Sequence, residues 1–146
     1  MRLLTSIDYP PVWLAGFLGL SWAVGRLVPL PGLPVTGLIM TGIGLLLMVL
    51  AVAQMLLART TFIPRREPGA LVSRGIFALT RNPIYLGDAL VLAGLSLYWQ
   101  ALAALPLVAL FVWVINRRFI AGEETALRKK FGPAYDRYLS GTRRWL

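Results

Sequence analysis

The sequence predicts an all-α, polytopic membrane protein with about four transmembrane helices in two hairpins, followed by cytoplasmic C-terminal helices. Hydrophobic residues make up 58% of the 146 residues and charged residues only 14%, whereas a soluble domain carries about 25% charged residues. The apolar residues also form long uninterrupted runs, and about 20 apolar helical residues are needed to cross the hydrocarbon of a bilayer. We therefore expect residues 1–146 to form a single integral membrane domain.

Two apolar runs near the N-terminus predict the first hairpin. Residues 12–30 form one span, with Arg26 close enough to its end to extend to the interface. Residues 35–58 form the clearest span, which contains no charge and a single Gln54. The prolines of residues 29–34 interrupt the helix between them, because each proline removes a donor and disfavours helix in its predecessor. Close helix packing in lipid is expected at three glycines, Gly37, Gly42 and Gly44.

Two shorter runs, residues 84–99 and 101–116, predict the second hairpin. Each is near the lower length limit for a span. Tyr98 and Trp99 lie where an interfacial aromatic belt is expected. Pro106 is expected to kink the last span.

The basic residues predict the orientation. Cytoplasmic loops carry an excess of Lys and Arg, and 13 of the 15 basic residues follow the second or the fourth span. This places residues 59–83, residues 117–146 and both termini in the cytoplasm, in what we expect to be a bacterial inner membrane. The net charge of +9 is also compatible with nucleic-acid binding. The sequence offers no soluble basic face, so we expect contact with anionic headgroups and no nucleic-acid partner.

The chain has no cysteine and no histidine. This excludes disulfides, thiolate nucleophiles, the usual Cys/His zinc sites and an imidazole base. Neither a Rossmann nor a P-loop glycine motif occurs, and no metal site is expected. Catalysis would have to depend on carboxylates, Arg, Lys, Tyr, backbone groups and a bound cofactor.

The first polar stretch ends in RNPIYLG, residues 81–87. Pro83 is favoured in the first turn of a helix, and Asn82 before it is suited to capping. The motif therefore predicts a helix N-terminus at the membrane boundary, where anionic groups can bind. The plain alternative is a helix start with Arg81 and Tyr85 at the interface.

The second polar stretch covers residues 116–146 and contains an acidic pair. Glu124 lies four residues before Arg128, which predicts a helical ion pair. Glu123 would then be free to face a pocket. Tyr135 and Tyr138 would cover one face of the following helix, unless they anchor it at the interface.

Asp88 is an acidic residue inside a predicted span. Ionisable residues in spans are functional candidates. Asp88 is close enough to the interface for an ion pair with Arg81 or Arg118.

Two motifs resemble those of the isoprenylcysteine carboxyl methyltransferase and phospholipid methyltransferase group of integral membrane enzymes. The group's pattern G-x-[YF]-x-x-x-R-[HN]-P-x-Y-x-G reads GIFALTRNPIYLG here, at residues 75–87. Its pattern E-E-x-x-L-x-x-x-[FY]-G-x-x-Y-x-x-Y reads EETALRKKFGPAYDRY, at residues 123–138. The order is right and the predicted hairpin lies between them. The first two spans match only as hydrophobic helices.

The resemblance implies S-adenosylmethionine as methyl donor, bound at the cytoplasmic face, and a lipophilic acceptor. It places the cofactor's amino group near Glu123. Arg118 matches the group's arginine before the acidic pair and would meet the acceptor. Arg81 and Arg118 are the candidate catalytic residues, since guanidinium groups can hold a carboxylate or another anion through paired hydrogen bonds. The implied cofactor-binding residues are Gly69, Ala70, Leu71, Val72, Phe77, Asn82, Pro83, Ile84, Tyr85 and Glu123.

The chain departs from the group's common pattern at Asn82, where many relatives have His, and at Phe77, where Tyr is common. The acceptor stays open among a prenylcysteine carboxylate, a phospholipid amine, a small thiol and a polyketide-like or quinone-like lipid. A non-catalytic membrane scaffold of the same fold is an alternative. A small four-helix transporter is another, although the first two spans lack the deep carboxylate that proton coupling needs.

Overall fold

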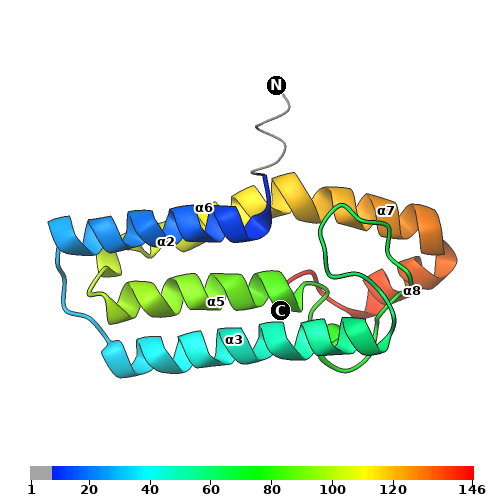
Figure 1. The fold of residues 1–146 in the computed structure, drawn as a ribbon, viewed down its shortest axis with the longest axis horizontal. Coiled ribbons are helices and arrows are strands. Elements are labelled where there is room, and N and C mark those ends of the chain that lie inside the picture. The colour runs from blue at the N-terminus through cyan, green and yellow to red at the C-terminus, as the bar shows by residue number, and fades with distance from the viewer. Residues whose placement is uncertain (1–7) are drawn as a thin grey trace.

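The computed structural model describes residues 8–146, which form helices joined by loops (Figure 1). This confirms the all-α class. The long helices lie side by side along the molecule, and the chain after the last of them folds back at one end. In chain order the elements are α2 (Pro10–Leu27), α3 (Pro34–Leu57), α4 (Ile76–Leu79), α5 (Pro83–Tyr98), the 3₁₀ turn η1 (Leu102–Ala104), α6 (Pro106–Ile115), the π turn η2 (Asn116–Ile120), α7 (Ala121–Phe131) and α8 (Pro133–Gly141).

A proline occupies the first turn of each of the five helices α2, α3, α5, α6 and α8. Proline is favoured there because its missing N–H would have no intrahelical partner. Pro106 follows this rule and begins α6 after the η1 turn. Because η1 and α6 belong to one continuous helical run, the helix type changes at Pro106, and the predicted kink there stays a prediction.

Two helices are long and apolar enough to cross a membrane: α3 and the continuous helical run Leu102–Phe131, which joins η1, α6, η2 and α7. α5 is apolar but shorter, with 16 residues, and α2 has 18. The predicted ranges 12–30, 35–58 and 84–99 agree with α2, α3 and α5 to within three residues at each end. The predicted end at residue 116 is wrong as a helix end, because the helix continues through the π turn into α7.

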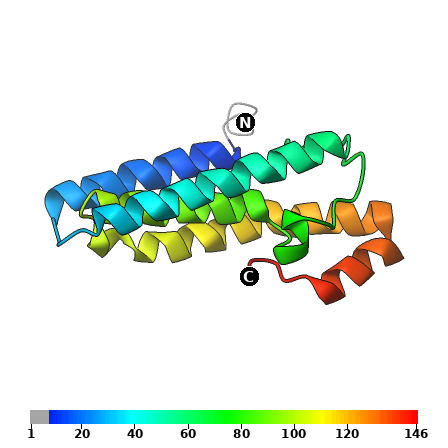
Figure 2. The same ribbon diagram turned by 90° about the horizontal axis from the view of Figure 1, so that it is seen from below.

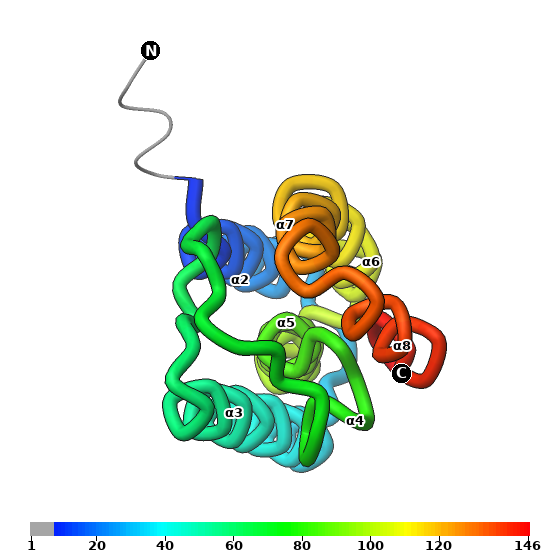
Figure 3. The backbone as a smooth tube through the Cα atoms, turned by 90° about the vertical axis from the view of Figure 1, so that its right-hand side faces the viewer, coloured from blue at the N-terminus to red at the C-terminus, as the bar shows by residue number. Residues whose placement is uncertain are grey.

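Glycines let α3 and α5 approach closely. Gly37 faces Gly94, and Gly44 faces Gly87; a Cβ added at Gly44 would lie 2.6 Å from the Gly87 carbonyl oxygen. Seen along the bundle, α5 lies between α2, α3 and α6 (Figure 3). The predicted close packing is confirmed at Gly37 and Gly44. It is wrong at Gly42, where an added Cβ meets nothing within 4 Å.

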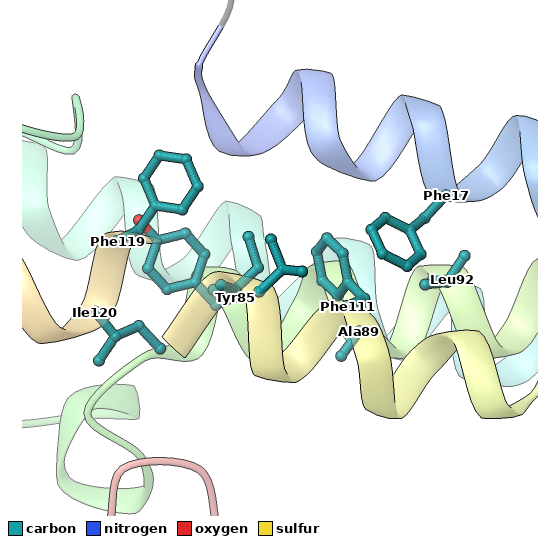
Figure 4. Close-up of a cluster of buried hydrophobic side chains, with 9 residues drawn as sticks. Phe17, Tyr85, Ala89, Leu92, Phe111, Phe119 and Ile120 are labelled. Carbon is teal, nitrogen blue, oxygen red and sulfur yellow. The ribbon is translucent and has the colours of Figure 1, made fainter. Parts of the chain in front are cut away.

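The opposite face of α5 packs against α2 and α6 through an apolar cluster (Figure 4). Phe17 of α2 meets Phe111 of α6 with ring centroids 5.5 Å apart. Tyr85, Ala89 and Leu92 supply the α5 side of the cluster. The cluster fixes the first turn of α5 against the chain that enters α7.

The π turn η2 redirects side chains where α6 passes into α7. It is closed by a hydrogen bond from the Ala121 N–H to the Asn116 carbonyl. Phe119 and Ile120 are both buried in the core, whereas Arg117 and Arg118 are exposed. Single π turns inside helices occur frequently at functional sites.

The loop after α3 crosses one end of the bundle and leads into α4 (Figure 3). Gln54 of α3 holds its end, since the Gln54 Oε1 accepts a hydrogen bond of 3.0 Å from the Ile76 N–H. Gly75 has φ +59°, and an added Cβ would overlap the Gln54 amide. The C-terminal residues return to the same end, beside the start of α5 (Figure 2). We call this end, which carries residues 58–82 and 117–146, the basic end of the bundle.

Candidate functional site

Tyr85 and Glu123 meet at the basic end. The Tyr85 hydroxyl donates a hydrogen bond of 2.7 Å to the Glu123 Oε1. Tyr85 lies in the first turn of α5 and is only 6% exposed, and Glu123 lies in the first turn of α7. Burial raises the pKa of the Glu123 carboxyl above its usual range. The structure thus joins one residue from each sequence motif.

Glu124 faces a different set of groups. Its two carboxylate oxygens accept hydrogen bonds of 2.9 and 2.6 Å from Arg144, and the Arg81 Nη2 lies 3.6 Å away. The predicted pairing of Glu124 with Arg128 is wrong, because Arg128 binds Asp136 at 2.9 Å. The cause is tertiary: α8 folds back, so the C-terminal segment reaches Glu124.

The C-terminal segment also binds the RNP motif. The Arg81 N–H donates to the Arg143 carbonyl at 3.0 Å, and the Asn82 Nδ2 donates to the Arg144 carbonyl at 2.9 Å. Asn82 occupies the N-cap position of α5, but its side chain makes no capping hydrogen bond. The predicted helix start at Pro83 is confirmed, and the capping role of the Asn82 side chain is wrong because Arg144 takes its amide.

The tyrosines of α8 pack inside the protein. Tyr135 is 1% exposed, and its ring centroid lies 6.2 Å from that of Tyr138. The Tyr138 hydroxyl donates to the carbonyl of Phe77, which is itself buried, at 2.5 Å. The two tyrosines therefore lie on one face of α8 and attach it to α4. Tyr135 is buried inside the protein and does not anchor the helix at the membrane interface.

The strip of residues 69–72 belongs to the loop at the basic end. The Gly69 N–H donates to the Thr60 Oγ1 at 3.0 Å, which holds the strip to the end of α3. Ala70, Leu71 and Val72 are half-buried. Between residues 8 and 146, no hydrogen bond joins this strip directly to Glu123 or Tyr85.

Arg118 points away from Glu123, toward α2. Its Nε and Nη2 donate to the two carboxylate oxygens of Asp8 at 3.1 and 2.9 Å. Its guanidinium carbon lies 5.2 Å from the centroid of the Trp13 ring. Arg118 and Glu123, predicted to serve one site, are therefore on two sides of the helix.

Asp88 is 4% exposed. The ion pairs of Arg81 and Arg118 go to Glu124 and Asp8. The predicted pairing of Asp88 with either arginine is wrong, because each arginine lies closer to another carboxylate.

Two hollows lie near these residues. A groove of about 550 Å³ runs along α2 and α6 and ends at Asp8 and Arg118; its other lining residues are Val12, Trp13, Gly16, Phe17, Leu20 and Leu110. A smaller pocket of about 220 Å³ lies between α7, α8 and Arg144. The groove is apolar along its length and charged at one end. The pocket carries the Glu124 and Arg144 ion pair.

The family profile described as phospholipid methyltransferase matches residues 33–134, which include the first motif and most of the second. The chain belongs to this family. An uncharacterized protein of Haemophilus influenzae is 43% identical to this phospholipid methyltransferase family member over 63 residues, which are 43% of this chain and 100% of the relative. No solved structure matches the chain. This membership confirms the resemblance seen in the sequence. It assigns the protein to the membrane methyltransferases as a class.

Sequence reasoning missed four residues that organise this end of the family member. Asp8 accepts hydrogen bonds from both Arg65 and Arg118, Arg144 joins the two motifs, and Gln54 holds α4. Gln54 was visible as the single amide side chain of its charge-free span. Asp8 was visible as the lone acidic residue before the first span. No local pattern marks Arg65 or Arg144, because their partners are distant in the sequence.

Proposed function

We propose that the protein transfers a methyl group from S-adenosylmethionine to a lipophilic acceptor at the cytoplasmic face of the membrane. The observation that carries the proposal is the pairing of Tyr85 with Glu123, one from each motif, at the basic end. A half-buried carboxylate held by a tyrosine is suited to an ammonium group, such as that of the cofactor's amino acid.

The neighbouring residues fit the rest of the cofactor. The Arg81 Nε is buried and has no hydrogen-bond partner within residues 8–146, so it can serve the carboxylate of the same amino acid. Ala70, Leu71 and Val72 are half-buried and apolar, which suits the purine ring. We propose that these residues, with Gly69, Phe77, Asn82, Pro83 and Ile84, surround the cofactor.

When bound, S-adenosylmethionine supplies a methyl group on a positively charged sulfur, ready for in-line displacement. Such a reaction depends on alignment of the reacting atoms. In this proposal Glu123, held by Tyr85, fixes the amino group, and Arg81 fixes the carboxylate. A carboxylate acceptor needs no base. An amine or thiol acceptor must release a proton, which a water can take in this histidine-free chain, since Glu123 holds the cofactor's amino group.

We propose that Arg118 meets the acceptor. It lies at the charged end of the groove along α2 and α6, where a lipid that stays in the bilayer would bring its polar group. In this proposal the acceptor and the cofactor approach the α7 helix from different sides, which explains why Arg118 and Glu123 do not face each other. This assignment makes Arg118 the acceptor residue and Arg81 a cofactor residue.

We further propose that α2, α3, α5 and the first part of the Leu102–Phe131 run are four spans of a single domain in a bacterial inner membrane. The support is the concentration of 13 of 15 basic residues at one end of the bundle. Lys and Arg collect in cytoplasmic segments. Residues 59–83, residues 117–146 and both termini are then cytoplasmic.

Calorimetric titration of the purified full chain in detergent tests the proposal. We expect heat of binding with a micromolar dissociation constant for S-adenosylmethionine and for its demethylated product. Thermal stabilisation by either compound is the second readout. No heat and no stabilisation at millimolar cofactor would overturn the enzyme assignment and would favour a non-catalytic scaffold of the same fold.

A further inference from the structure

Asp88 differs from the other five acidic residues of the chain in its lack of a partner. Four of the others form ion pairs with Arg or Lys side chains: Asp8, Glu67, Glu124 and Asp136. The fifth, Glu123, accepts a hydrogen bond from the Tyr85 hydroxyl. No hydrogen bond or ion pair joins the Asp88 carboxyl to any residue in the range 8–146. Asp88 is therefore the one acid in this part of the chain that no donor neutralises.

Asp88 also lies where an unpaired carboxylate is costly. It is 4% exposed and belongs to the apolar helix α5. Gly87 before it packs against Gly44 of α3, and Ala89 after it belongs to the apolar cluster shown in Figure 4. Burial of a carboxylate is unfavourable unless a cation or hydrogen-bond donors compensate it, and ionisable residues inside membrane helices are functional candidates. The position therefore points to a partner that residues 8–146 do not supply.

The position of Asp88 relative to Tyr85 and Glu123 matches the layout of the methyl donor. Residues three apart on a helix are neighbours, so Asp88 follows Tyr85 on α5 with a rise of about 4.5 Å. Tyr85 lies in the first turn of α5, which places Asp88 deeper in the bundle. In S-adenosylmethionine, two methylene groups separate the sulfonium from the carbon that carries the amino group. A cofactor whose amino group is held at Glu123 can therefore bring its sulfonium to the level of Asp88.

The charges of the proposed cofactor site leave one cation without an anion. The amino group of S-adenosylmethionine is assigned to Glu123 and its carboxylate to Arg81, whereas its sulfonium has no assigned partner. A sulfonium sulfur has no hydrogen to donate, so its charge is balanced by an anion nearby. This attraction is strong where water is excluded. Asp88 is an anion without a cation, and the sulfonium is a cation without an anion.

We propose that Asp88 is a specificity-determining residue that pairs with the sulfonium charge of the methyl donor. The inference rests on the proposed function and deepens it, because it gives the same site a preference for the charged donor over its neutral product. When the methyl group has been transferred, the sulfur keeps the electron pair of the broken bond and becomes a neutral thioether. Asp88 then loses its cation, which favours release of the product.

The test is calorimetric titration of the full chain in detergent with S-adenosylmethionine and with S-adenosylhomocysteine, its demethylated product. Asp88→Asn keeps the size of the side chain and removes its charge. The two ligands share the amino acid, the ribose and the purine, so a general disturbance of the site cancels in the ratio of their dissociation constants. We expect Asp88→Asn to weaken S-adenosylmethionine about tenfold or more. The affinity for S-adenosylhomocysteine should stay nearly unchanged, which also shows that the variant is folded.

A third ligand, sinefungin, separates the effect of charge from that of the methyl group. Sinefungin carries an ammonium group on a carbon at the place of the sulfonium, so it is a cation there without a sulfur. We expect Asp88→Asn to weaken sinefungin by a factor similar to that for S-adenosylmethionine. If sinefungin behaves like S-adenosylhomocysteine instead, the shape of the methyl group decides the preference, and the proposal is overturned.

Two control variants complete the comparison. Glu123→Gln should weaken all three ligands by similar factors, because each of them carries the amino group, and should leave the ratio unchanged. Asp136→Asn removes an exposed acid, paired with Arg128 at 2.9 Å, from the basic end and should change no constant. An equal change of the ratio in Asp136→Asn and Asp88→Asn would mean that only net charge matters, and would overturn the proposal.

The remaining outcomes separate this inference from the proposed function. An unchanged ratio in Asp88→Asn, or a loss of both ligands, would give Asp88 a structural role and would overturn the inference alone. If the unsubstituted chain binds none of the three ligands, the proposed function is wrong, and the inference that rests on it is wrong as well.

Discussion

The Tyr85 hydroxyl lies 2.7 Å from the Glu123 Oε1 and joins α5 to α7 at the basic end of the bundle. The adjacent Glu124 has entirely different partners, Arg144 and Arg81. Two neighbouring carboxylates thus have separate structural roles. One is half-buried beside a single phenol, and the other is neutralised by two arginines.

Glu123→Gln and Glu124→Gln should therefore differ. A charge-assisted hydrogen bond contributes about 1.5–3 kcal/mol, and 1.4 kcal/mol corresponds to about a tenfold change in a dissociation constant. We expect Glu123→Gln to weaken cofactor binding at least about tenfold, with a nearly unchanged melting temperature. Glu124→Gln should lower the melting temperature instead. Titration calorimetry and thermal unfolding measure the two effects, and equal losses of affinity would contradict the assigned roles.

Cofactor binding should weaken as the pH falls. Burial raises the pKa of Glu123, so this carboxyl takes up its proton at a higher pH than an ordinary glutamate. The protonated acid cannot form an ion pair with the cofactor's ammonium group, which stays charged throughout this range. Affinity should therefore be complete above the raised pKa and decline below it. In Glu123→Gln the residual affinity should not follow this profile, and an unchanged profile would assign the titration to another group.

Arg144 should contribute more to stability than Arg128. It binds both oxygens of Glu124 and lies in the segment whose carbonyls accept from Thr80 and Asn82. We expect Arg144→Gln to lower the free energy of unfolding by about 1–3 kcal/mol. Arg128→Gln is the control, because its exposed pair should cost only about 0–1 kcal/mol. Thermal unfolding in detergent compares them, and equal melting temperatures would argue against the C-terminal bridge.

Gly44 and Gly42 offer a test of the α3 and α5 contact. A Cβ at Gly44 would lie 2.6 Å from the Gly87 carbonyl oxygen, whereas Gly42 is open. Overpacking typically costs about 1–3 kcal/mol, so Gly44→Leu should lower the melting temperature in detergent. Gly42→Leu adds the same side chain on the outer face and should leave it nearly unchanged. A similar fall in melting temperature for both variants would mean that the contact between α3 and α5 does not depend on Gly44.

The proposed orientation can be tested with single cysteines, because the chain has none of its own. Ser73→Cys and Ser140→Cys should resist an impermeant thiol reagent in intact cells, since both lie at the basic end. Leu33→Cys, at the opposite end, should react; Leu33 is 54% exposed. Labelling of Ser73→Cys from outside the cell would mean that the orientation is the opposite of the proposed one.

Local sequence patterns predicted the helices well. The long apolar runs place α2, α3 and α5 to within three residues at each end, and Pro83 lies in the first turn of α5 as predicted. The run 101–116 contains α6, but its helix continues past residue 116. These signals depend on hydrophobicity and backbone geometry within one segment. The family could be predicted for the same reason, because its two motifs are contiguous strings, residues 75–87 and 123–138.

The side-chain partners could not be predicted in this way. Glu124 has a suitable cation one helical turn away, yet it binds Arg144. The reason is that α8 folds back, so the segment after it brings Arg144 to both oxygens of the half-buried Glu124 carboxylate. Asn82 could cap its own helix, yet its amide binds the Arg144 carbonyl.

The sequence by itself determined an all-helical membrane protein of the phospholipid methyltransferase family, with its charge at one end. The tertiary structure alone decided that Glu123 meets Tyr85 while Arg118 binds Asp8, to which Arg65 also donates. The physical reason is that hydrophobicity and proline act within one segment, whereas an ion pair depends on which segments the folded bundle brings within about 3 Å of each other.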